Sequence, residues 1–570
     1  MDVNTLIEEF KNTFLPEDFI WRKGQKEAII EIIDAYVNKT HNVVIIDAPV
    51  GSGKSLIGMT AAWILNQHGK NGYILASDIT LQIQYEKDFK QFNLNWGSVK
   101  GIDNYMCIDN DEKNSLGTCR VRNKPPQKFS CYSECPYFSA RDFAAQSSTS
   151  LLNYAYWLIQ ENYVNQRADP LFPPRDFTIC DEAHKVLDIV QNHYSPRFDA
   201  KTLEKLQKLT EFFVTYKVKD HWKDFYVIKD QLSKIFHEEN QERLLENLIN
   251  IELSLESYKP SIEIFKNKVN TDYPHKSPPR EWREALRLCD WLKDIHCKVE
   301  DYVNIIDITS TRNLIKNPQG KDEIVFNCLE ENYLMHKYFH AWSGFTVLMS
   351  ATISDPKAYL NNIALKNAKY IKMDSNFDFT NSPIYYYNQH KMSYNHIEAN
   401  LPWLYETINK ILDKHKHESG IIHSASYDLT MKISNNLSKA NKKRILFYNG
   451  TQEKRDVIEI LKKEKNKVLI GPSLLEGLDF KDDWSRFCIF AKVPYLSLAD
   501  KFVKVKLQIK PDWYRWKAII NILQGVGRSV RSEDDWAVTY ILDGSLGDLI
   551  HNNRSSFPVE FFQRLKIINE

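Results

Sequence analysis

Short runs of consecutive apolar residues recur along the first third of the chain, and polar or helical segments separate them. The run at 42–47 leads into a helical pattern over 56–67, and further runs lie at 72–77 and 177–180. Continuous apolar runs of this length, alternating with helices, are typical of parallel strands buried on both faces. We therefore predict a doubly wound α/β domain whose functional residues follow the carboxyl ends of its strands.

The pattern changes between about residues 195 and 335, where apolar residues recur at helical spacing. Two series each share one helical face: Leu203, Leu206, Leu209 and Phe213, and Leu244, Leu248, Ile251 and Leu255. We expect a helical insertion of more than a hundred residues here. Strand-like runs then return at 345–349, 420–423, 443–447, 467–470 and 536–542. This return predicts a second α/β domain in the C-terminal third.

Length and composition narrow the class of protein. A chain of 570 residues is too long for one core, and 43% hydrophobic with 26% charged residues is typical of a globular protein. The net charge of +1 means that any nucleic-acid site must be a local patch. The apolar runs are too short to span a membrane, and the acidic first residues do not form a signal peptide. We expect an intracellular protein without a membrane partner, in cytoplasm, nucleoid or nucleus, or in a host cell if the source is viral.

A glycine-rich loop follows the first predicted strand. It comprises Ala48, Pro49, Val50, Gly51, Ser52, Gly53, Lys54 and Ser55, and departs from the usual phosphate-binding pattern only in Ala48, which replaces a glycine. The glycines let backbone N–H groups face phosphate oxygens, Lys54 adds a charge at the β/γ-phosphates, and Ser55 offers a hydroxyl to Mg²⁺. A glycine turn with a chance lysine is the alternative, and the flanking strand and helix argue against it.

Two acids, Asp181 and Glu182, follow the strand at 177–180 in the order Asp-Glu-Ala-His. We expect Asp181 to hold Mg²⁺ through water, and Glu182 to orient or deprotonate an attacking water. Acids are also common at the start of a helix, where they interact favourably with its dipole. The phosphate-binding loop upstream favours the metal over this structural role.

A third polar motif, near the C-terminus, contains Gln524, Arg528 and Arg531. The two arginines are three residues apart and share one helical face. Such a pair suits the charge that develops on a γ-phosphate, supplied from a second domain. A basic surface helix is the alternative.

Four of the nine cysteines lie between the loop and the acids: Cys107, Cys119, Cys131 and Cys135. In an unexported chain such clustering favours metal over disulfides. Four thiolates can hold a [4Fe–4S] cluster or a tetrahedral Zn²⁺, and spacing alone leaves both open. Four basic residues, Arg120, Arg122, Lys124 and Lys128, are followed by aromatic residues. This pattern suits a path for single-stranded nucleic acid, and a solvated loop is the alternative.

Together these motifs resemble superfamily 2 helicases, and in detail the XPD/DinG iron–sulfur branch. Arg22 and Gln25 are similar to its adenine-recognising motif, and the segment 80–84 to one expected to touch DNA. The segment 350–352 resembles the motif that couples the ATP and DNA sites. A further motif is similar at Glu476, Gly477 and Asp479. Two departures are the absence of a C-x-x-C pair and, after Asp543, of an arginine that the family often has.

The resemblance implies two RecA-like domains with ATP and Mg²⁺ between them and a [4Fe–4S] cluster on the four cysteines. The residues implied in catalysis are Lys54, Asp181, Glu182, Gln524, Arg528 and Arg531, and those implied in nucleotide contact add Arg22, Gln25, the loop 48–55, Glu476, Gly477 and Asp479. It further implies a monomeric DEAH-box motor that moves 5′ to 3′ on single-stranded DNA and unwinds forks, with repair or replication proteins as partners. A non-catalytic or RNA-directed scaffold on the same fold is the alternative.

The resemblance also sets expected domain boundaries. They are 1–99, 151–194 and 336–375 for the first RecA-like domain, 100–150 for the iron–sulfur domain, 195–335 for an Arch-like helical domain, and 376–570 for the second RecA-like domain.

Overall fold

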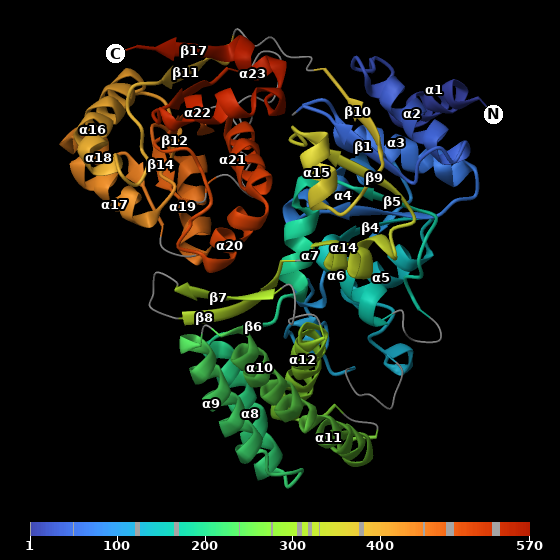
Figure 1. Ribbon diagram of the computed structural model, residues 1–570. Helices are drawn as coiled ribbons and strands as arrows, with labels where there is room; N and C mark the ends of the chain where they lie inside the picture. Colours follow the sequence, from blue (N-terminus) through green and yellow to red (C-terminus); the bar gives the residue numbers. More distant parts are fainter. Residues whose placement is uncertain are drawn as a thin grey trace.

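Two sheet domains lie beside each other, and a helical module extends from below them (Figure 1). This arrangement comes from a computed structural model. The described residues are 2–49, 51–119, 126–164, 170–238, 240–274, 277–304, 310–316, 322–329, 331–374, 381–448, 451–472, 474, 484–526 and 536–569. Among the described helices, none has the length and apolar composition that crossing a membrane requires.

The first domain contains a seven-stranded parallel sheet of order β10-β1-β9-β5-β2-β4-β3. Its strands are β1 (Val43–Asp47), β2 (Gly72–Ala76), β3 (Gly97–Ser98), β4 (Thr149–Asn153), β5 (Phe177–Cys180), β9 (Phe345–Ser350) and β10 (Lys369–Lys372). Val44 and Ile46 face one core cluster and Ile45 faces the other, so the sheet is buried on both faces as the apolar runs predicted. The strands β9 and β10 follow the helical module in the sequence and complete this sheet.

Helices cover both faces of the first sheet. They are α1 (Val3–Phe14), α2 (Gln25–Val37), α3 (Lys54–Gln67), α4 (Ile79–Gln91), α6 (Tyr154–Ile159) with the turn η4 (Gln160–Val164), η5 (Ala183–Lys185), α7 (Val186–Tyr194), α14 (Glu331–Met335), η6 (His336–His340) and α15 (Pro356–Asn362).

The second domain repeats this plan with a parallel sheet of order β13-β14-β12-β15-β16-β11-β17. Its strands are β11 (Ile384–Tyr387), β12 (Gly420–His423), β13 (Ile445–Leu446), β14 (Val468–Gly471), β15 (Phe487–Phe490), β16 (Val538–Ile541) and β17 (Leu565–Ile568). Its helical elements are α16 (Ile397–Lys414), α17 (Tyr427–Asn436), α18 (Lys439–Lys442), α19 (Thr451–Lys463), α20 (Lys501–Ile509), α21 (Pro511–Val526), α22 (Ser545–Asn552), η9 (Arg554–Ser556) and α23 (Val559–Arg564). Two RecA-like α/β domains, the expected fold class, are therefore confirmed.

The insertion between β5 and β9 is helical through most of its length. Its helices are α8 (Ala200–Thr215), α9 (Trp222–His237), α10 (Gln241–Glu256), α11 (Tyr258–Asp272) and α12 (Arg280–Val303). The expected helical insertion is present, and at its two ends it also contains strands that the sequence did not predict. There β6 (Arg197–Phe198), β7 (Ser310–Lys316) and β8 (Asp322–Cys328) form an antiparallel sheet of order β6-β8-β7. In β8 the side chains at alternate positions, Ile324, Phe326 and Cys328, pack into one core cluster, as the period of a strand requires.

The cysteine-containing segment has little regular structure. Its elements are η1 (Ile102–Asn104), η2 (Asn114–Leu116), η3 (Pro126–Lys128) and α5 (Pro136–Gln146), after which the chain re-enters the sheet at β4. It contacts the helical module through α12, because Arg283 Nη2 donates to Glu112 Oε2 at 2.7 Å and Arg287 pairs with Asp103. The two insertions of the first domain therefore touch each other.

Candidate functional site

The glycine-rich loop connects β1 to α3, at the carboxyl edge of the first sheet. Gly51 and Gly53 have φ angles of 78° and 79°, in the left-handed region that glycine adopts without a Cβ penalty. A Cβ on Gly53 would also lie 2.4 Å from Gln25 Nε2. Because α3 begins at Lys54, its free N–H groups open onto the loop, which is a favourable place for phosphate.

Arg22 and Gln25 hold this loop from beneath. Gln25 Nε2 donates to Ser52 O at 2.8 Å, and the Arg22 guanidinium donates to Gly51 O. The Arg22 backbone N–H in turn donates to Gln25 Oε1 at 2.8 Å. Gln25 is buried, and both side chains hydrogen-bond to the backbone of the loop. Their contact with adenine stays a prediction.

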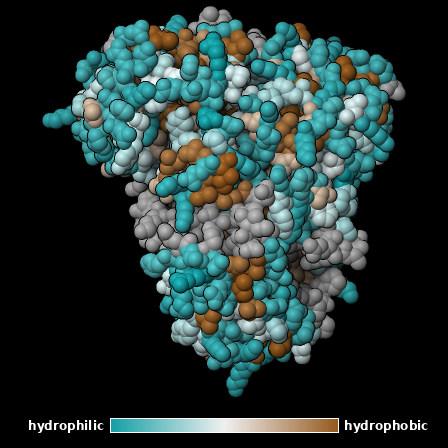
Figure 2. All heavy atoms as spheres, in the orientation of Figure 1, coloured by the Kyte–Doolittle hydropathy of each residue, from teal (hydrophilic) through white to brown (hydrophobic). Residues whose placement is uncertain are grey.

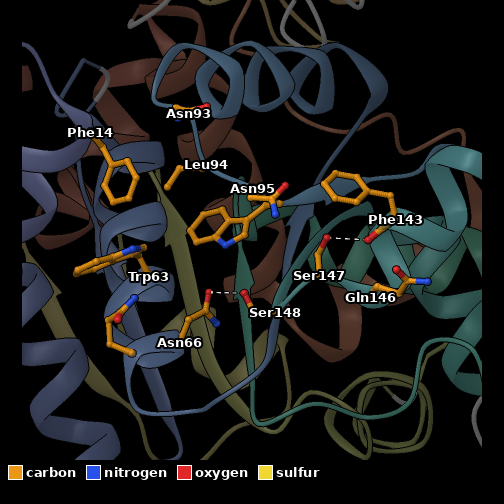
Figure 3. A pocket seen from close by; sticks show the side chains of 12 residues that line it. Phe14, Trp63, Asn66, Asn93, Leu94, Asn95, Phe143, Gln146, Ser147 and Ser148 are labelled. Carbon is orange, nitrogen blue, oxygen red and sulfur yellow. Dashed lines mark hydrogen bonds between the residues drawn. The ribbon is translucent and has the colours of Figure 1, made fainter.

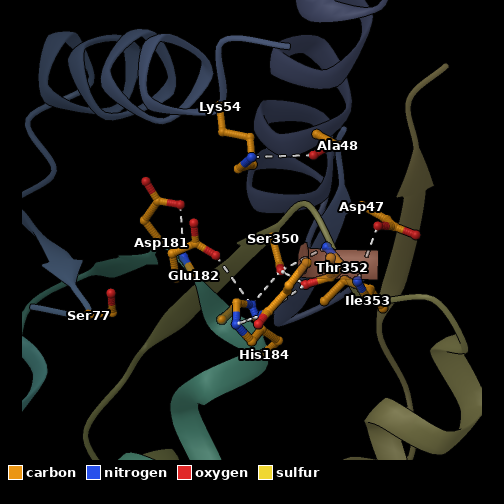
Figure 4. Close-up of polar contacts among 12 residues, drawn as sticks. Asp47, Ala48, Lys54, Ser77, Asp181, Glu182, His184, Ser350, Thr352 and Ile353 are labelled. Carbon is orange, nitrogen blue, oxygen red and sulfur yellow. Dashed lines mark hydrogen bonds and ion pairs between the residues drawn. The ribbon is translucent and has the colours of Figure 1, made fainter. Parts of the chain in front are cut away.

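The two acids lie across from Lys54, at the end of β5 (Figure 4). Tyr85 Oη donates to Asp181 Oδ2 at 2.9 Å, and the Glu182 backbone N–H donates to Asp181 Oδ1 at 2.8 Å. Burial, together with the charge of Glu182, raises the pKa of Asp181 to about 6, against the opposing effect of Lys54. Ser55 also adjoins Tyr85, whose pKa it lowers against the effect of burial, so the two proposed Mg²⁺ ligands lie next to one tyrosine.

His184 connects the acids to the second domain. Its Nδ1 donates to Ser350 Oγ at 2.8 Å and lies 3.3 Å from Glu182 Oε2. The Gln524 amide, on α21, donates to His184 Nε2 and lies 3.5 Å from Thr352 Oγ1. Burial lowers the pKa of His184 to about 4, which leaves the ring neutral at physiological pH. A side chain of one domain therefore contacts the polar network around the acids of the other.

Six of the residues expected at this site lie outside the described residues: Val50, Glu476, Gly477, Asp479, Arg528 and Arg531. Helix α21 ends at Val526, just before the two arginines. Their roles stay predictions.

Some site contacts were not foreseen in the sequence. Asp47, at the end of β1, accepts hydrogen bonds from Tyr370 Oη at 2.6 Å and from the Ile353 N–H at 3.3 Å, and burial raises its pKa. Tyr85 bonds to Asp181 from α4, almost a hundred residues earlier in the chain. Only Asp47 could have been recognised in the sequence, because an aspartate at the end of a buried strand is a candidate site residue. The tyrosines carried no such signal, because their partners are distant in sequence.

Gln82 has a different position from the one that the resemblance implied. It is fully buried, and its amide donates to Ser98 Oγ at 2.9 Å and to Val99 O at 3.0 Å. It therefore attaches α4 to the start of the cysteine segment, while its neighbours Thr80 and Gln84 are exposed.

The four cysteines come together at the cysteine segment. Cys107, Cys119 and Cys135 are buried and Cys131 is partly buried. Burial raises the pKa of the Cys131 thiol, and the neighbouring charges of Asp109, Cys107 and Cys135 raise it further. Asn114 Nδ2 donates to Cys135 Sγ at 3.2 Å, and Cys119 packs with Cys135 against Phe138. The donor set thus fits a thiolate-bound metal group.

The spacing of these sulfurs bears on which group they fit. Thiolates around one zinc ion bind at about 2.3 Å, so their sulfurs lie roughly 4 Å apart. Among the described residues, no three of these sulfurs lie within 4.8 Å of one another. In a [4Fe–4S] cluster each thiolate binds a different iron, which needs a wider set.

A separate pocket of about 560 Å³ opens at the opposite edge of the first sheet (Figure 3). Its aromatic wall contains Trp63, Trp96 and Phe143, and Asn66 and Ser148 join across it at 3.0 Å. Trp63 and Asn66 lie in the last turns of α3, and the other residues precede β3 or β4, so the pocket lies at the amino ends of the strands. The face of the molecule in Figure 2 is mostly hydrophilic, with apolar patches on the second sheet domain and on the helical module.

Comparison with known proteins agrees with this geometry. A family model for the helicase C-terminal domain matches residues 408–561, and a model for the res subunit of type III restriction enzymes matches residues 18–216. A protein of Methanocaldococcus jannaschii described as a probable ATP-dependent helicase is 24% identical over 213 residues. That match covers 32% of this chain and 32% of the relative, so it spans about a third of the relative's length.

Solved structures match over nearly the whole chain. The structure of Xpd4 from S. tokodaii has a TM-score of 0.60 at 16% identity, covering 96% of this chain and 100% of that one. An XPD helicase structure has a TM-score of 0.60 at 15% identity and covers 96% and 99%. Residues 408–561 are thus similar to the helicase C-terminal domain family, and the two-domain fold is that of the XPD helicase structures, in agreement with the resemblance found in the sequence.

Proposed function

We propose that the protein is an ATP-dependent DNA helicase that moves 5′ to 3′ on single-stranded DNA and unwinds duplexes. The observation that carries the proposal is the contact of Gln524, in the second domain, with His184, whose ring adjoins Glu182 in the first. A motor must couple its nucleotide site to movement between domains, and this contact joins the two. The RecA-like fold and the helicase-domain matches support the same function.

Each residue at the nucleotide site has a proposed role. Lys54 neutralises phosphate charge, Ser55 and Asp181 hold Mg²⁺, and Glu182 orients the attacking water. When bound, Mg²⁺ supplies positive charge next to the transferred phosphoryl group. The neutral His184 ring holds Glu182 and Gln524 in register. Arg528 and Arg531 complete the site from the second domain.

The nucleic-acid path is proposed to run past the two insertions. The contact of Glu112 with Arg283 brings the cysteine segment and α12 together, and both grow from the first domain. A wedge on one side of the motor gives a single direction of unwinding. The four cysteines would hold a [4Fe–4S] cluster that ties together a segment with little secondary structure. The domain boundaries stated from the sequence are retained as part of this proposal.

The proposal is tested by ATP hydrolysis with and without single-stranded DNA. The wild-type protein should show hydrolysis that DNA stimulates, and Glu182→Gln should bind ATP but not turn it over. An equal response to RNA would favour the RNA-directed alternative. Absence of hydrolysis with nucleic acid bound would favour the scaffold.

The cluster is tested by protein purified without air. We expect iron and sulfide in cluster stoichiometry. Cys107→Ser should lose both, while the buried Cys289→Ser on α12 should keep them. Zinc in place of iron would contradict the cluster and leave the motor intact.

A further inference from the structure

Helix α12 carries three potential metal ligands far from the four cysteines in sequence. They are His296 Nδ1, Cys297 Sγ and a Glu300 carboxylate oxygen, and all lie within 4.8 Å of one another. Histidine and glutamate at positions i and i+4 share one face of a helix, and the cysteine lies beside them. His296 is buried, Cys297 is partly buried, and Glu300 is exposed, so the group opens from the helix core towards solvent.

His296 is held in the tautomer that a metal ligand requires. Its Nε2 lies 2.8 Å from Glu252 Oε1 on α10, which accepts the ring N–H. The lone pair then resides on Nδ1. That atom is buried without a hydrogen-bond partner and is 3.8 Å from Glu300 Oε2, too far for a hydrogen bond. The side chain of His296 is only 3% exposed, so bulk solvent does not reach the ring.

This arrangement matches how proteins prepare a histidine for a metal. Ligating histidines almost always donate their second ring nitrogen to a carboxylate or carbonyl, which fixes the ring and raises its basicity. Glu252 occupies that position. An unpaired buried ring nitrogen otherwise costs free energy, and a bound cation would remove the cost.

The charges around the group favour a cation. Asp294, Asp301 and Glu300 all act on Cys297, and Lys259 is the opposing positive charge. Lys259 lies 3.5 Å from Glu256, which offsets part of its effect. Tetrahedral ligands at about 2.0–2.3 Å from zinc are roughly 3.3–3.8 Å apart, so the exposed Glu300 and the partly buried Cys297 need only small side-chain movements.

We propose that His296, Cys297 and Glu300 form a binding site for a borderline-soft divalent metal ion, with Zn²⁺ as the best match. One imidazole, one thiolate and one carboxylate are a ligand set that zinc accepts, and a water molecule would take the fourth position. Binding releases the thiol proton of Cys297 to solvent. Because Glu252, which orients the His296 ring, belongs to α10, metal binding here depends on the contact between α10 and α12.

The test measures alkylation of Cys297 by iodoacetamide in the full chain, with and without Zn²⁺. The modified peptide is quantified by mass spectrometry, so thiols elsewhere do not contribute. Cys297 is partly exposed and should react in the metal-free protein, and Zn²⁺ should suppress the reaction. Equal rates with and without Zn²⁺ would overturn the proposal.

Two variants separate ligation from folding. Glu300→Gln removes an exposed ligand without touching the core and should abolish most of the protection, while Glu252→Gln should raise the Zn²⁺ concentration needed by about 10–100-fold. The control is Glu284→Gln, which replaces an exposed carboxylate on the same helix that pairs with Arg280. In this variant Zn²⁺ should protect Cys297 from alkylation as it does in the wild type. Full protection in Glu300→Gln, or loss of it in the control, would contradict the assigned ligands.

Discussion

Individual side chains at the nucleotide site are held in conformations that cost stability. Asp181 is a buried carboxylate next to a second acid, and Glu182 has a φ of 51°, in the left-handed region that non-glycine residues avoid. Such costs concentrate at functional sites, where the surrounding structure imposes them. Replacing these residues should therefore separate stability from activity.

Asp181→Asn should stabilise the fold at neutral pH while it abolishes ATP turnover. The folded pKa of about 6 lies above the ordinary 3.8, so the folded state binds more protons in that window and stability falls as pH rises through it. Asparagine removes this penalty, and its amide can donate to Tyr85 Oη. Thermal unfolding without nucleotide should show a midpoint a few degrees above wild type at pH 7.5. The difference should vanish near pH 4, and a lower midpoint at both pH values would contradict the burial argument.

Gly53→Ala should weaken ATP binding far more than Gly69→Ala. Both glycines have positive φ, at 79° and 71°, so alanine costs each about 1–2 kcal/mol of backbone strain. Only the Cβ on residue 53 meets Gln25 Nε2, while the one on residue 69 meets nothing within 4 Å. Nucleotide titration of both variants is the measurement. Similar affinities would show that Gln25 does not shape the loop.

At the scale of elements, α21 is the helix that brings the second domain to the site. Trp516 Nε1 donates to Ile353 O at 3.1 Å, and Lys517 pairs with Asp188 on α7. Gln524 follows on the same helix. The helix therefore has one end anchored on the first domain and the other beside its acids.

Gln524→Ala should reduce nucleic-acid-stimulated hydrolysis by up to about tenfold. A rate change of this size corresponds to the free energy of about one hydrogen bond. ATP affinity should change less, because the amide of Gln524 hydrogen-bonds to His184 and Thr352, which lie outside the phosphate-binding loop. The matched control is Asn521→Ala on the same helix, whose amide donates to Pro494 O within the second domain. Equal losses in both variants would argue for general damage to α21.

Sequence patterns predicted those elements whose burial is uniform. The runs that became β1, β5 and β9 are mostly apolar and buried along nearly their whole length, so their composition and length identified them. The edge strand β10 begins and ends with lysine, and β6 is two residues long, so neither carries a readable pattern. The loop and the acids were predictable because their chemistry is local. The His184–Gln524 contact joins residues 340 positions apart, which no local pattern encodes.

At the scale of the whole molecule, a buried ion cluster joins the two RecA-like domains. Glu331, the first residue of α14, is fully buried and pairs with Lys506 and Lys510 of α20. Lys506 is also buried, with its ammonium 3.9 Å from the centre of the Trp513 ring. Burial lowers the pKa of Lys506, and the charge of Glu331 opposes this.

Glu331→Gln should destabilise the protein by about 3–5 kcal/mol, because it leaves a buried ammonium without its counter-charge. The control is Asp548→Asn, which breaks the exposed pair with Lys391 and should cost less than about 1 kcal/mol. Urea unfolding of both variants measures the difference. A loss in Glu331→Gln no greater than in the control would show that the cluster is not a structural link.

Strand displacement on tailed duplex DNA, with ATP and Mg²⁺, tests the central claim most directly. The wild-type protein should displace the strand of a duplex with a 5′ single-stranded tail and leave one with only a 3′ tail intact. Lys54→Ala should displace neither, because the ATP phosphates lose the positively charged side chain that neutralises them. The control Lys416→Ala replaces an exposed lysine and should act as wild type. Unwinding from a 3′ tail alone would contradict the proposed direction. Displacement by Lys54→Ala at the wild-type rate would contradict the ATP-driven motor itself.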